Sequence, residues 1–274
     1  MLKALLGNTI NGFAKDLRGW RARANVHPTW ESAAAGAAYE DPDLIEFRAR
    51  NSEILVRRDS GRAGGTPGLN YLRLCALQVQ DQSGPVHVVD FGGSFGDEGV
   101  MLVGDDRFVG ATYTVCETPA VVARARGIVF PPGIAFVSDL AAIGRCDIFF
   151  SSGALAYVRD HAPILEAAAG LRPAFIILVR NSFSEREIIR LQESRLFDNV
   201  PPARAQGGFE NRRVRYPHRT INQEAVVGLL AGRGYDLVAS FAEQSGVYPY
   251  GDRVYGRDLI FLDRDRPRGR VGRA

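Results

Sequence analysis

The sequence predicts an α/β fold in which a mostly parallel sheet is covered by helices on both faces and preceded by an N-terminal helical cap. From Pro85 onward, short strands rich in Val, Ile and Phe alternate with helical segments, which is typical of parallel sheets. A glycine-rich loop directly follows the first of these strands. The last two strands have no helix between them, so they should pair antiparallel. We therefore expect a mostly parallel sheet whose last strand is antiparallel.

The chain divides into three predicted parts: a helical cap at 1–84, an α/β domain at 85–263, and an arginine-rich tail at 264–274 that we expect to be disordered. Its 274 residues suffice for one large or two small domains. Apolar residues recur at three- and four-residue steps from Leu2 to Trp20, and most basic residues lie off that stripe. Such a basic amphipathic helix suits an anionic membrane surface, a protein partner or, most commonly, its own domain.

Each element of the α/β part is predicted from a short apolar run or a capped periodic segment. The expected strands are Val86–Phe91, Tyr113–Glu117, Ile134–Val137, Asp147–Ser151, Phe175–Val179, Tyr235–Ala242 and Arg257–Leu262. The expected helices are one through Leu72 and Val79, then Pro119–Arg126, His161–Gly170 and Asn222–Arg233, the last with Asn222 as N-cap and Gly234 as C-cap.

Charge and cysteine content exclude several classes of protein. The net charge is +3, and the segment Asp263–Ala274 alone supplies it with five Arg and two Asp. The rest of the chain therefore has no net charge, which argues against general nucleic-acid binding, since that needs a basic face. Three cysteines without a C-x-x-C spacing indicate neither a disulfide framework nor a zinc site, so no metal is expected. A reducing compartment fits best, and with no signal peptide or membrane span apparent we expect a cytoplasmic protein.

The most informative stretch, His87 to Gly96, reads HVVDFGGSFG. An apolar strand ends in Asp90, and glycines at 92, 93 and 96 allow a sharp turn and a close approach of backbone to a ligand. Glu117 ends the next strand 21 positions after Gly96, where nucleotide-binding α/β folds place a carboxylate that accepts ribose hydroxyls. An ordinary turn is the alternative for the glycine-rich loop, and a solvated strand-end carboxylate is the alternative for Glu117, when each feature is taken alone.

Together with the antiparallel ending, these residues resemble the class I S-adenosylmethionine-dependent methyltransferases from about Pro85 to Leu262. DFGGSFG resembles their first motif, with Ser94 in place of the middle glycine. With VCE at 115–117 and SSGALAYV at 151–158, the chain resembles a family of putative bacterial methyltransferases associated with surface-polysaccharide gene clusters. The resemblance implies a Rossmann-like sheet and S-adenosylmethionine as cofactor.

The resemblance also implies which positions hold that cofactor. Its methionine moiety is expected at Asp90 and the 92–96 backbone, its ribose at Glu117, its adenine beside Asp139 and its reactive end near Ser152. The full set of implied cofactor-binding residues is Asp90, Phe91, Gly92, Gly93, Ser94, Gly96, Glu117, Asp139, Leu140, Ser152 and Gly153.

Methylation of oxygen or nitrogen needs a general base as well as alignment of the two reactants. The candidates are His161, His218 and Tyr157, which lie after the fourth strand or after the fifth. For each of them a surface or packing role is the commoner interpretation. His87, inside the first strand, is expected to be structural.

The connection from Arg180 to Ile221 is long enough to suggest a lid loop. Its part from Arg204 to Arg219 carries five Arg and one Glu, a local charge of +4. We interpret this as recognition of a phosphate or carboxylate through Arg212, Arg213 and Arg215, and a solvated loop or a subunit contact is the alternative. In an extended segment Arg213 and Arg215 would share one face and Arg212 the other.

The function these observations predict is methyl transfer from S-adenosylmethionine to a small or glycan-like, anionic acceptor, at oxygen. The oxygen preference rests on the family's genetic association alone. A second hypothesis is a cofactor-binding but catalytically silent subunit that acts through a partner. A third, an NAD-dependent oxidoreductase, is disfavoured because the loop departs from G-x-G-x-x-G and the sheet ends antiparallel. Homo-oligomerisation stays open.

Overall fold

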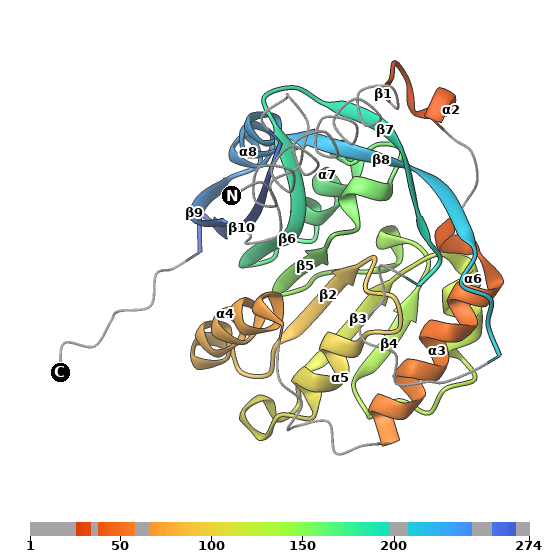
Figure 1. The fold of residues 1–274 in the computed structure, drawn as a ribbon. Helices are drawn as coiled ribbons and strands as arrows, with labels where there is room; N and C mark the ends of the chain where they lie inside the picture. Colours follow the sequence, from red (N-terminus) through yellow and green to blue (C-terminus); the bar gives the residue numbers. More distant parts are fainter. Residues whose placement is uncertain (1–25, 34–37, 58–65, 198–207, 243–253, 267–274) are drawn as a thin grey trace, which may run out of the picture.

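The structure is a computed structural model, and it describes residues 26–33, 38–57, 66–197, 208–242 and 254–266. Within these ranges ten strands form one sheet (Figure 1). The strands are β1 (Val26–His27), β2 (His87–Phe91), β3 (Thr112–Cys116), β4 (Ile134–Val137), β5 (Ile148–Ser152), β6 (Phe175–Ser184), β7 (Ile188–Arg195), β8 (Arg213–Asn222), β9 (Tyr235–Ala242) and β10 (Tyr255–Asp263). The α-helices are α2 (Trp30–Ala33), α3 (Pro42–Arg57), α4 (Pro67–Ser83), α5 (Asp97–Val103), α6 (Pro119–Ala125), α7 (Ala162–Gly170) and α8 (Gln223–Gly232).

The centre of the sheet is parallel, in the order β4–β3–β2–β5–β6. Beyond β6 the direction changes, because β10 pairs antiparallel with both β6 and β9. The predicted fold class, a mostly parallel α/β sheet with an antiparallel last strand, is therefore confirmed. Of the strands predicted from sequence, all but the one beginning at Phe175 end within two residues of their observed ends.

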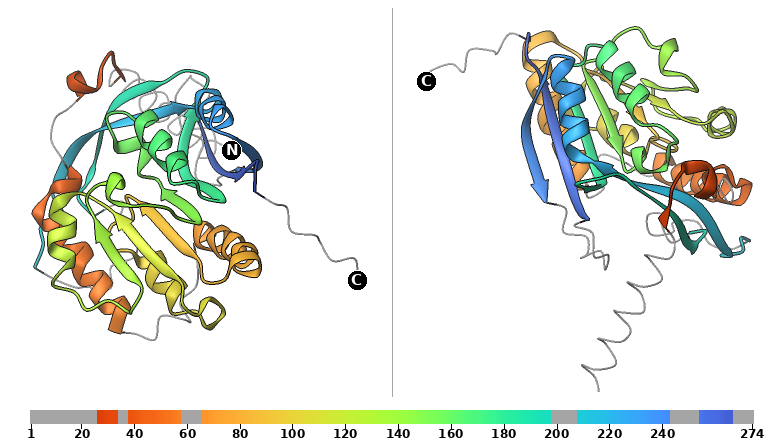
Figure 2. Two further views of the ribbon diagram at one scale, coloured as in Figure 1. Left: turned by 180° about the vertical axis from the view of Figure 1, so that it is seen from behind. Right: turned by 90° about the horizontal axis from the view of Figure 1, so that it is seen from above.

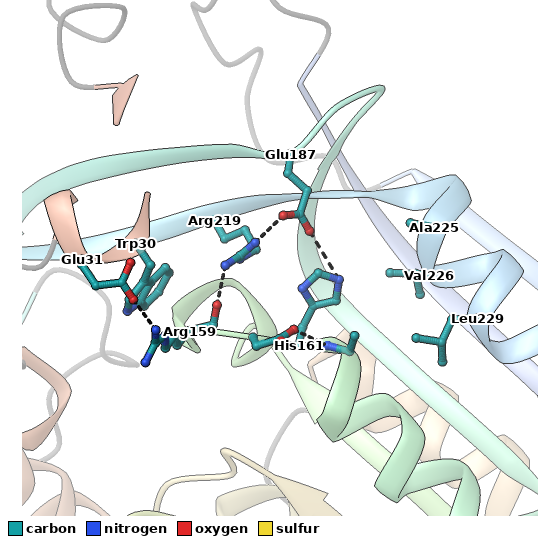
Figure 3. A pocket seen from close by; sticks show the side chains of 11 residues that line it. Trp30, Glu31, Arg159, His161, Glu187, Arg219, Ala225, Val226 and Leu229 are labelled. Atoms are coloured by element: carbon teal, nitrogen blue, oxygen red, sulfur yellow. Dashed lines mark hydrogen bonds and ion pairs between the residues drawn. The ribbon is translucent and has the colours of Figure 1, made fainter. Parts of the chain in front are cut away.

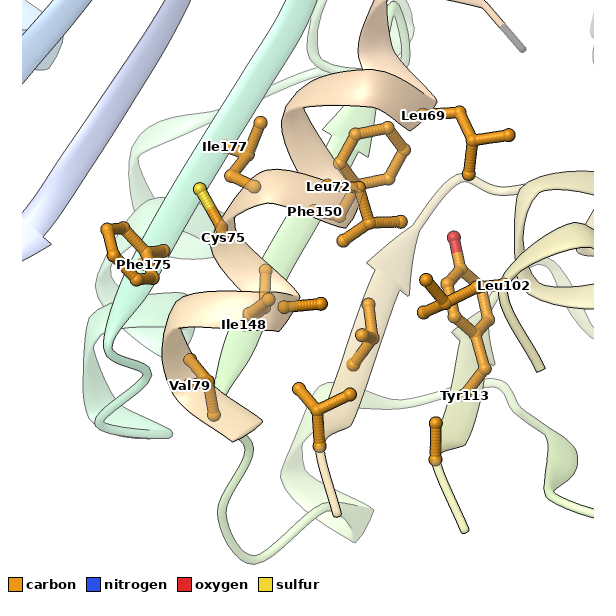
Figure 4. Packing of buried hydrophobic residues seen from close by; sticks show 14 of the residues in the cluster. Leu69, Leu72, Cys75, Val79, Leu102, Tyr113, Ile148, Phe150, Phe175 and Ile177 are labelled. Atoms are coloured by element: carbon orange, nitrogen blue, oxygen red, sulfur yellow. The ribbon is translucent and has the colours of Figure 1, made fainter. Parts of the chain in front are cut away.

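Successive side chains of the central strands alternate between two cores, which is why these strands read as continuous apolar runs. On β6, Ile177 packs beneath α4 and α5, whereas Ile176 packs with α7 and α8 on the opposite face. Figure 4 shows the first of these cores, where Leu72 and Cys75 of α4 lie over Ile148 and Phe150 of β5. The helix predicted through Leu72 and Val79 is thus one of the layers that cover the sheet.

Several local predictions hold at the level of single contacts. The Asn222 side chain caps α8 by accepting from the Ala225 N–H at 2.9 Å. His87 is structural, since its ring nitrogens lie 2.9 Å from the Arg145 carbonyl oxygen and 3.0 Å from Thr114 Oγ1. The segment Leu2–Trp20 and most of the arginine-rich tail lie outside the described residues, and the predicted domain boundaries stay predictions.

The predicted lid loop from Arg180 to Ile221 is wrong in its secondary structure. Strand β6 continues to Ser184, and β7 and β8 then pair antiparallel along their whole length from Ile188↔Thr220 to Arg195↔Arg213. These two strands, which we call the arm, cross over the top of the molecule from β6 toward α3 (Figures 1 and 2). The prediction failed because the segment is rich in Arg and lacks the apolar alternation by which strands are recognised, since much of the arm is solvated.

The far end of the arm is attached to α3. Phe197, just past β7, stacks on Phe47 of α3 with ring centroids 4.3 Å apart, and Phe209 meets the same ring edge-on at 5.5 Å. Arg212 forms an ion pair with Asp41, whose carbonyl oxygen accepts the Ile45 N–H in the first turn of α3. The arm therefore spans the carboxyl edge of the sheet and is held at both ends.

Candidate functional site at the carboxyl edge of the sheet

The glycine-rich loop after β2 contains backbone conformations that are unfavourable for residues with a side chain. Gly92 and Gly96 have positive φ of 73° and 70°, and Ser94 between them has φ 55°. A Cβ at Gly92 would lie 2.2 Å from the Ala154 Cβ, and one at Gly93 would lie 2.0 Å from Asp90 Oδ2. The loop thus brings bare backbone against the ends of β2 and β5.

Asp90 is buried beneath this loop, with 1% of its surface exposed. Its Oδ2 accepts the Tyr113 hydroxyl at 2.7 Å, while Oδ1 has no hydrogen-bond partner among the described residues. Burial raises the pKa of Asp90 well above its usual range, and the neighbouring Glu98 carboxylate adds to this effect. A buried carboxylate with one unused oxygen suits a ligand that brings a donor or a positive charge.

Glu117, at the end of β3, is joined to the same loop. Its Oε1 accepts the Ser94 N–H at 3.1 Å and its Oε2 accepts the Thr118 N–H at 2.7 Å. Burial raises the pKa of Glu117, and these two hydrogen bonds together with the charge of Arg48 oppose that rise. The structure therefore brings Asp90, the glycine loop and Glu117 together, as the sequence predicted.

The ends of β4 and β5 extend the same edge on either side. Asp139 is exposed and accepts the Ala141 N–H at 2.9 Å, which caps the single turn η4 (Leu140–Ala142), and Leu140 is buried. After β5, Gly153 has φ 72° and donates its N–H to the Val179 carbonyl oxygen at 2.9 Å. Ser152, just before it, accepts a hydrogen bond from Arg180 of β6 at 2.9 Å.

An aromatic group lies where the arm passes over this edge. Tyr157, in the turn η5 (Leu155–Tyr157), lies 5.2 Å from the His218 ring and 5.7 Å from the Tyr216 ring, both on β8. Tyr39, from the turn η1 (Ala38–Glu40), lies 4.6 Å from Tyr157. Burial lowers the pKa of His218 to about 4, and the charge of Arg190 adds to that shift, so His218 is neutral near pH 7. Two of the three base candidates are thus neighbours.

His161, the third base candidate, lines a separate cavity of about 440 Å³ (Figure 3). Its Nε2 lies 3.6 Å from Glu187 Oε1, and its buried Nδ1 has no partner among the described residues. Arg219 forms an ion pair with that same Glu187 and lies over the Trp30 ring at 5.7 Å. Arg159 in the opposite wall pairs with Glu31 at 2.7 Å. No residue of the glycine loop lines this cavity.

The arginines predicted to bind an acceptor each have a carboxylate partner. Arg212 pairs with Asp41, while Arg213 and Arg215 pair with Glu193 at 3.3 and 2.8 Å. Arg213 and Arg215 do share a face, and both are largely exposed, at 77% and 62% of their side-chain surface. Their role as acceptor contacts stays a prediction.

Two functional candidates were missed from the sequence. Arg180 is the exposed position in a ten-residue strand that is otherwise buried, and a charged residue within FIILVRNSFS was the signal that could have revealed it. Arg48 lies on α3 with its guanidinium carbon 5.4 Å from the centre of the Tyr39 ring, and nothing in the local sequence distinguishes it from other helical arginines.

Other classes of site find no support in the described part of the chain. It contains no group of three or more His, Cys, Asp or Glu side chains placed to hold a metal ion. Within the same ranges no helix has the length and apolar character that a membrane crossing requires. Cys75, Cys116 and Cys146 are buried, unpaired thiols, and burial raises the pKa of each to about 12.

No protein-family model and no curated protein matches the chain. Solved structures with a similar course include the N-terminal domain of EvdMO1 with S-adenosylhomocysteine bound, at 18% identity over 74% of this chain and 82% of that one, with a TM-score of 0.43. Another is a Burkholderia thailandensis 1,6-didemethyltoxoflavin-N1-methyltransferase, at 15% identity, 84% and 92% coverage and a TM-score of 0.41. A third is an S-adenosylmethionine-dependent methyltransferase from Mesorhizobium loti, at 16% identity, 72% and 98% coverage and a TM-score of 0.44. These scores lie below 0.5, so the assignment of function rests on the residues of this chain.

Proposed function

We propose that the protein is a methyltransferase that uses S-adenosylmethionine bound at the carboxyl edge of β2, β3 and β5. The observation that carries the proposal is the joint arrangement of the glycine loop, Asp90 and Glu117. In open α/β sheets, ligands bind outside the carboxyl ends of the strands where the chain order reverses, and here β2 lies between β3 and β5 at that point. Backbone closeness at Gly92 and Gly93 and the unused Asp90 Oδ1 fit a cofactor with an amino-acid end.

The antiparallel ending of the sheet supports this cofactor over a dinucleotide. A dinucleotide fold repeats a second parallel half beyond its first, and in this chain the corresponding position is taken by antiparallel β10 and β9. The positions we assign to the cofactor are those predicted from the sequence, from Asp90 to Gly153.

The cofactor would supply an electrophilic methyl group on a sulfonium, so the protein has to bind, align and exclude water. Asp90 and the loop backbone would hold one end and Glu117 the ribose hydroxyls. The arm, attached to α3 through Phe47, roofs this edge and limits access of water. Tyr157 and His218 are the nearest groups for accepting a proton from an acceptor, since they lie together under the arm.

The acceptor we propose is a small or glycan-like molecule methylated at oxygen, as the resemblance implies. Arg212, Arg213 and Arg215 remain candidates for contacts to it. A cytoplasmic location is proposed on the three buried, unpaired thiols.

A catalytically silent, cofactor-binding subunit is the second candidate. It is favoured by the low pKa of His218, about 4, which makes that imidazole a weak base near pH 7. Transfer of a labelled methyl group to any acceptor by the purified protein would exclude it.

Calorimetric titration, together with thermal unfolding in the presence of ligand, tests the proposal directly. S-Adenosylhomocysteine at 100 times its Kd should stabilise the fold by about 2.7 kcal/mol and raise the melting temperature, and NAD should not. A shift with NAD and none with S-adenosylhomocysteine at millimolar concentration would overturn the assignment.

A further inference from the structure

Within the described residues, two guanidinium groups lie at the carboxyl edge with no carboxylate at ion-pair distance. Arg180 comes from β6 and Arg48 from α3. Within the described residues neither side chain forms an ion pair with a carboxylate, which separates them from the arginines of the arm. The carboxyl groups of the site act on them only from beyond ion-pair distance. Burial raises the pKa of Asp90 and of Glu98, and the charge of Arg180 opposes that rise. Burial lowers the pKa of Arg48, and the charge of Glu117 opposes that fall. Both guanidiniums therefore keep donors that no carboxylate of the described residues takes up.

The backbone of β6 departs from regular strand geometry at Arg180. Its φ is +56°, a conformation that non-glycine residues adopt rarely and that collects at binding sites. The buried Asp258 of β10 holds this turn by accepting the Arg180 N–H at 2.8 Å, at the point where the pairing of β10 with β6 shifts register. The side chain then lies over the end of β5, with Nε 2.9 Å from Ser152 Oγ and Nη2 3.2 Å from the Ser152 carbonyl oxygen.

These two bonds leave most of the Arg180 donors available, because a guanidinium carries five N–H groups. The bonds also fix its position beside Gly153, where a Cβ would meet Arg180 atoms at 3.6 to 3.8 Å. Arg180 is therefore positioned by the fold, and its remaining N–H groups have no partner among the described residues.

Arg48, on α3, likewise forms no ion pair within the described residues. The Arg48 guanidinium carbon lies 5.4 Å from the centre of the Tyr39 ring, and the centres of the Tyr39 and Tyr157 rings are 4.6 Å apart. Arg48 makes no hydrogen bond within the described residues. Burial lowers its pKa; the charge of Glu117 opposes this and the charge of Arg180 adds to it. The charges of Arg48 and Arg180 therefore interact at the same edge of the sheet.

We propose that Arg48 and Arg180 together bind an oxyanion, a carboxylate or a phosphate, at this edge. Two planar forks converging on one region match the geometry of such groups. The anion has two possible sources, the carboxylate at the amino-acid end of the cofactor and an anionic group of the acceptor. Only the identity of the anion rests on the proposed function. The anion site itself is defined by the two arginines.

The test is calorimetry on the full chain with three probes. S-Adenosylhomocysteine carries the carboxylate, 5′-methylthioadenosine keeps the adenosine and sulfur but lacks the amino-acid end, and inorganic phosphate is a free oxyanion. The variants are Arg48→Gln and Arg180→Gln. The matched control is Arg107→Gln, because Arg107 is an exposed arginine paired with Asp105 away from the edge.

Loss of one charged hydrogen-bonding group should lower affinity about tenfold or more. If the cofactor supplies the anion, both variants weaken S-adenosylhomocysteine by that factor and leave 5′-methylthioadenosine unchanged. If the acceptor supplies it, both leave S-adenosylhomocysteine unchanged and weaken phosphate binding to the cofactor-saturated protein. Either result supports the inference, and Arg107→Gln should match the parent in both.

The inference is overturned if Arg48→Gln and Arg180→Gln bind all three probes as the control does, or if phosphate binds nowhere and S-adenosylhomocysteine binding is unchanged. Should Arg180→Gln fail to fold, Arg48→Gln still decides, because Arg48 makes no hydrogen bond to a described residue that the exchange could break. If S-adenosylhomocysteine does not bind the parent but phosphate binds and both variants weaken it, the proposed function fails and this inference stands.

Discussion

The carboxyl edge of the sheet and the arm are both rich in charged residues, but these residues are paired differently in the two regions. On the arm, Arg213 and Arg215 share Glu193 and Arg219 pairs with Glu187, on two regularly paired strands. At the carboxyl edge, Asp90 Oδ1 has no hydrogen-bond partner and Arg180 forms no ion pair within the described residues.

The backbone differs in the same sense. Among the described residues, three non-glycine positions have positive φ, and two of them, Ser94 and Arg180, lie at the carboxyl edge of the sheet. Hydrogen bonding does not separate the two regions, because Arg212 Nη1 and Arg219 Nε are buried without a hydrogen-bond partner among the described residues, as is Asp90 Oδ1. Charges paired with carboxylates on an extended backbone indicate a structural or solvated surface, whereas a guanidinium without an ion pair on a strained backbone indicates binding. The number of charges in a segment is therefore a poorer guide to an anion site than the absence of partners for them.

The largest effect should come from a substitution within the glycine-rich loop. In Gly93→Ala the new methyl group would lie 2.0 Å from Asp90 Oδ2, which Tyr113 holds in place. We expect a loss of about 1–3 kcal/mol of stability from overpacking and at least a hundredfold loss of S-adenosylhomocysteine affinity. Gly144→Ala is the matched control, since a Cβ there meets nothing within 4 Å. Equal affinities in the two variants would show that the loop is an ordinary turn.

A smaller loss is expected at the ribose position. Glu117→Ala removes a charged acceptor, and each hydrogen bond to such a group contributes about 1.5–3 kcal/mol. Affinity for S-adenosylhomocysteine should fall at least tenfold by calorimetry, with the circular dichroism spectrum unchanged. A folded Glu117→Ala protein with full affinity would mean that this carboxylate only holds the loop.

His218, on the inner face of the arm, should make the free energy of unfolding depend on pH. The folded pKa of His218, about 4, lies below its unfolded value of about 6.5. The unfolded state therefore binds more protons, and stability is complete above pH 6.5 and falls as pH drops toward 4, by up to about 1.4 kcal/mol per pH unit. His218→Gln should flatten the urea-denaturation profile over that window. An unchanged profile would place His218 in water.

The outer face of the arm should respond least. Replacing Arg213 and Arg215 together with Gln breaks two exposed ion pairs, so stability should change by less than about 1 kcal/mol. Phosphate affinity should fall less than in the Arg180→Gln variant. A larger fall in the double variant would reverse the comparison and make the arm the anion site.

Sequence reasoning succeeded where a residue's role follows from its neighbours in the chain. Asp90, Gly92 and Glu117 lie at strand ends, and parallel strands bring those ends to one edge, so their meeting could be predicted. The helix cap at Asn222 and the antiparallel β9–β10 pair follow from equally local rules.

It failed where partners are distant in sequence. Arg212 is neutralised by Asp41, and Arg180 is positioned by Asp258; pairings over such separations leave no local pattern. The arm was taken for a loop because strands that carry polar residues on both faces lack apolar alternation. Arg48 could not be found at all, since only the packing of α3 brings it to the edge.

Calorimetric titration of the parent protein with S-adenosylhomocysteine, repeated with Gly93→Ala and Gly144→Ala, tests the central claim most directly. The account predicts one site per chain in the parent and in Gly144→Ala, and at least a hundredfold weaker binding in Gly93→Ala. Absence of binding in a folded parent, or equal binding in all three proteins, would contradict a cofactor site at the carboxyl edge of β2.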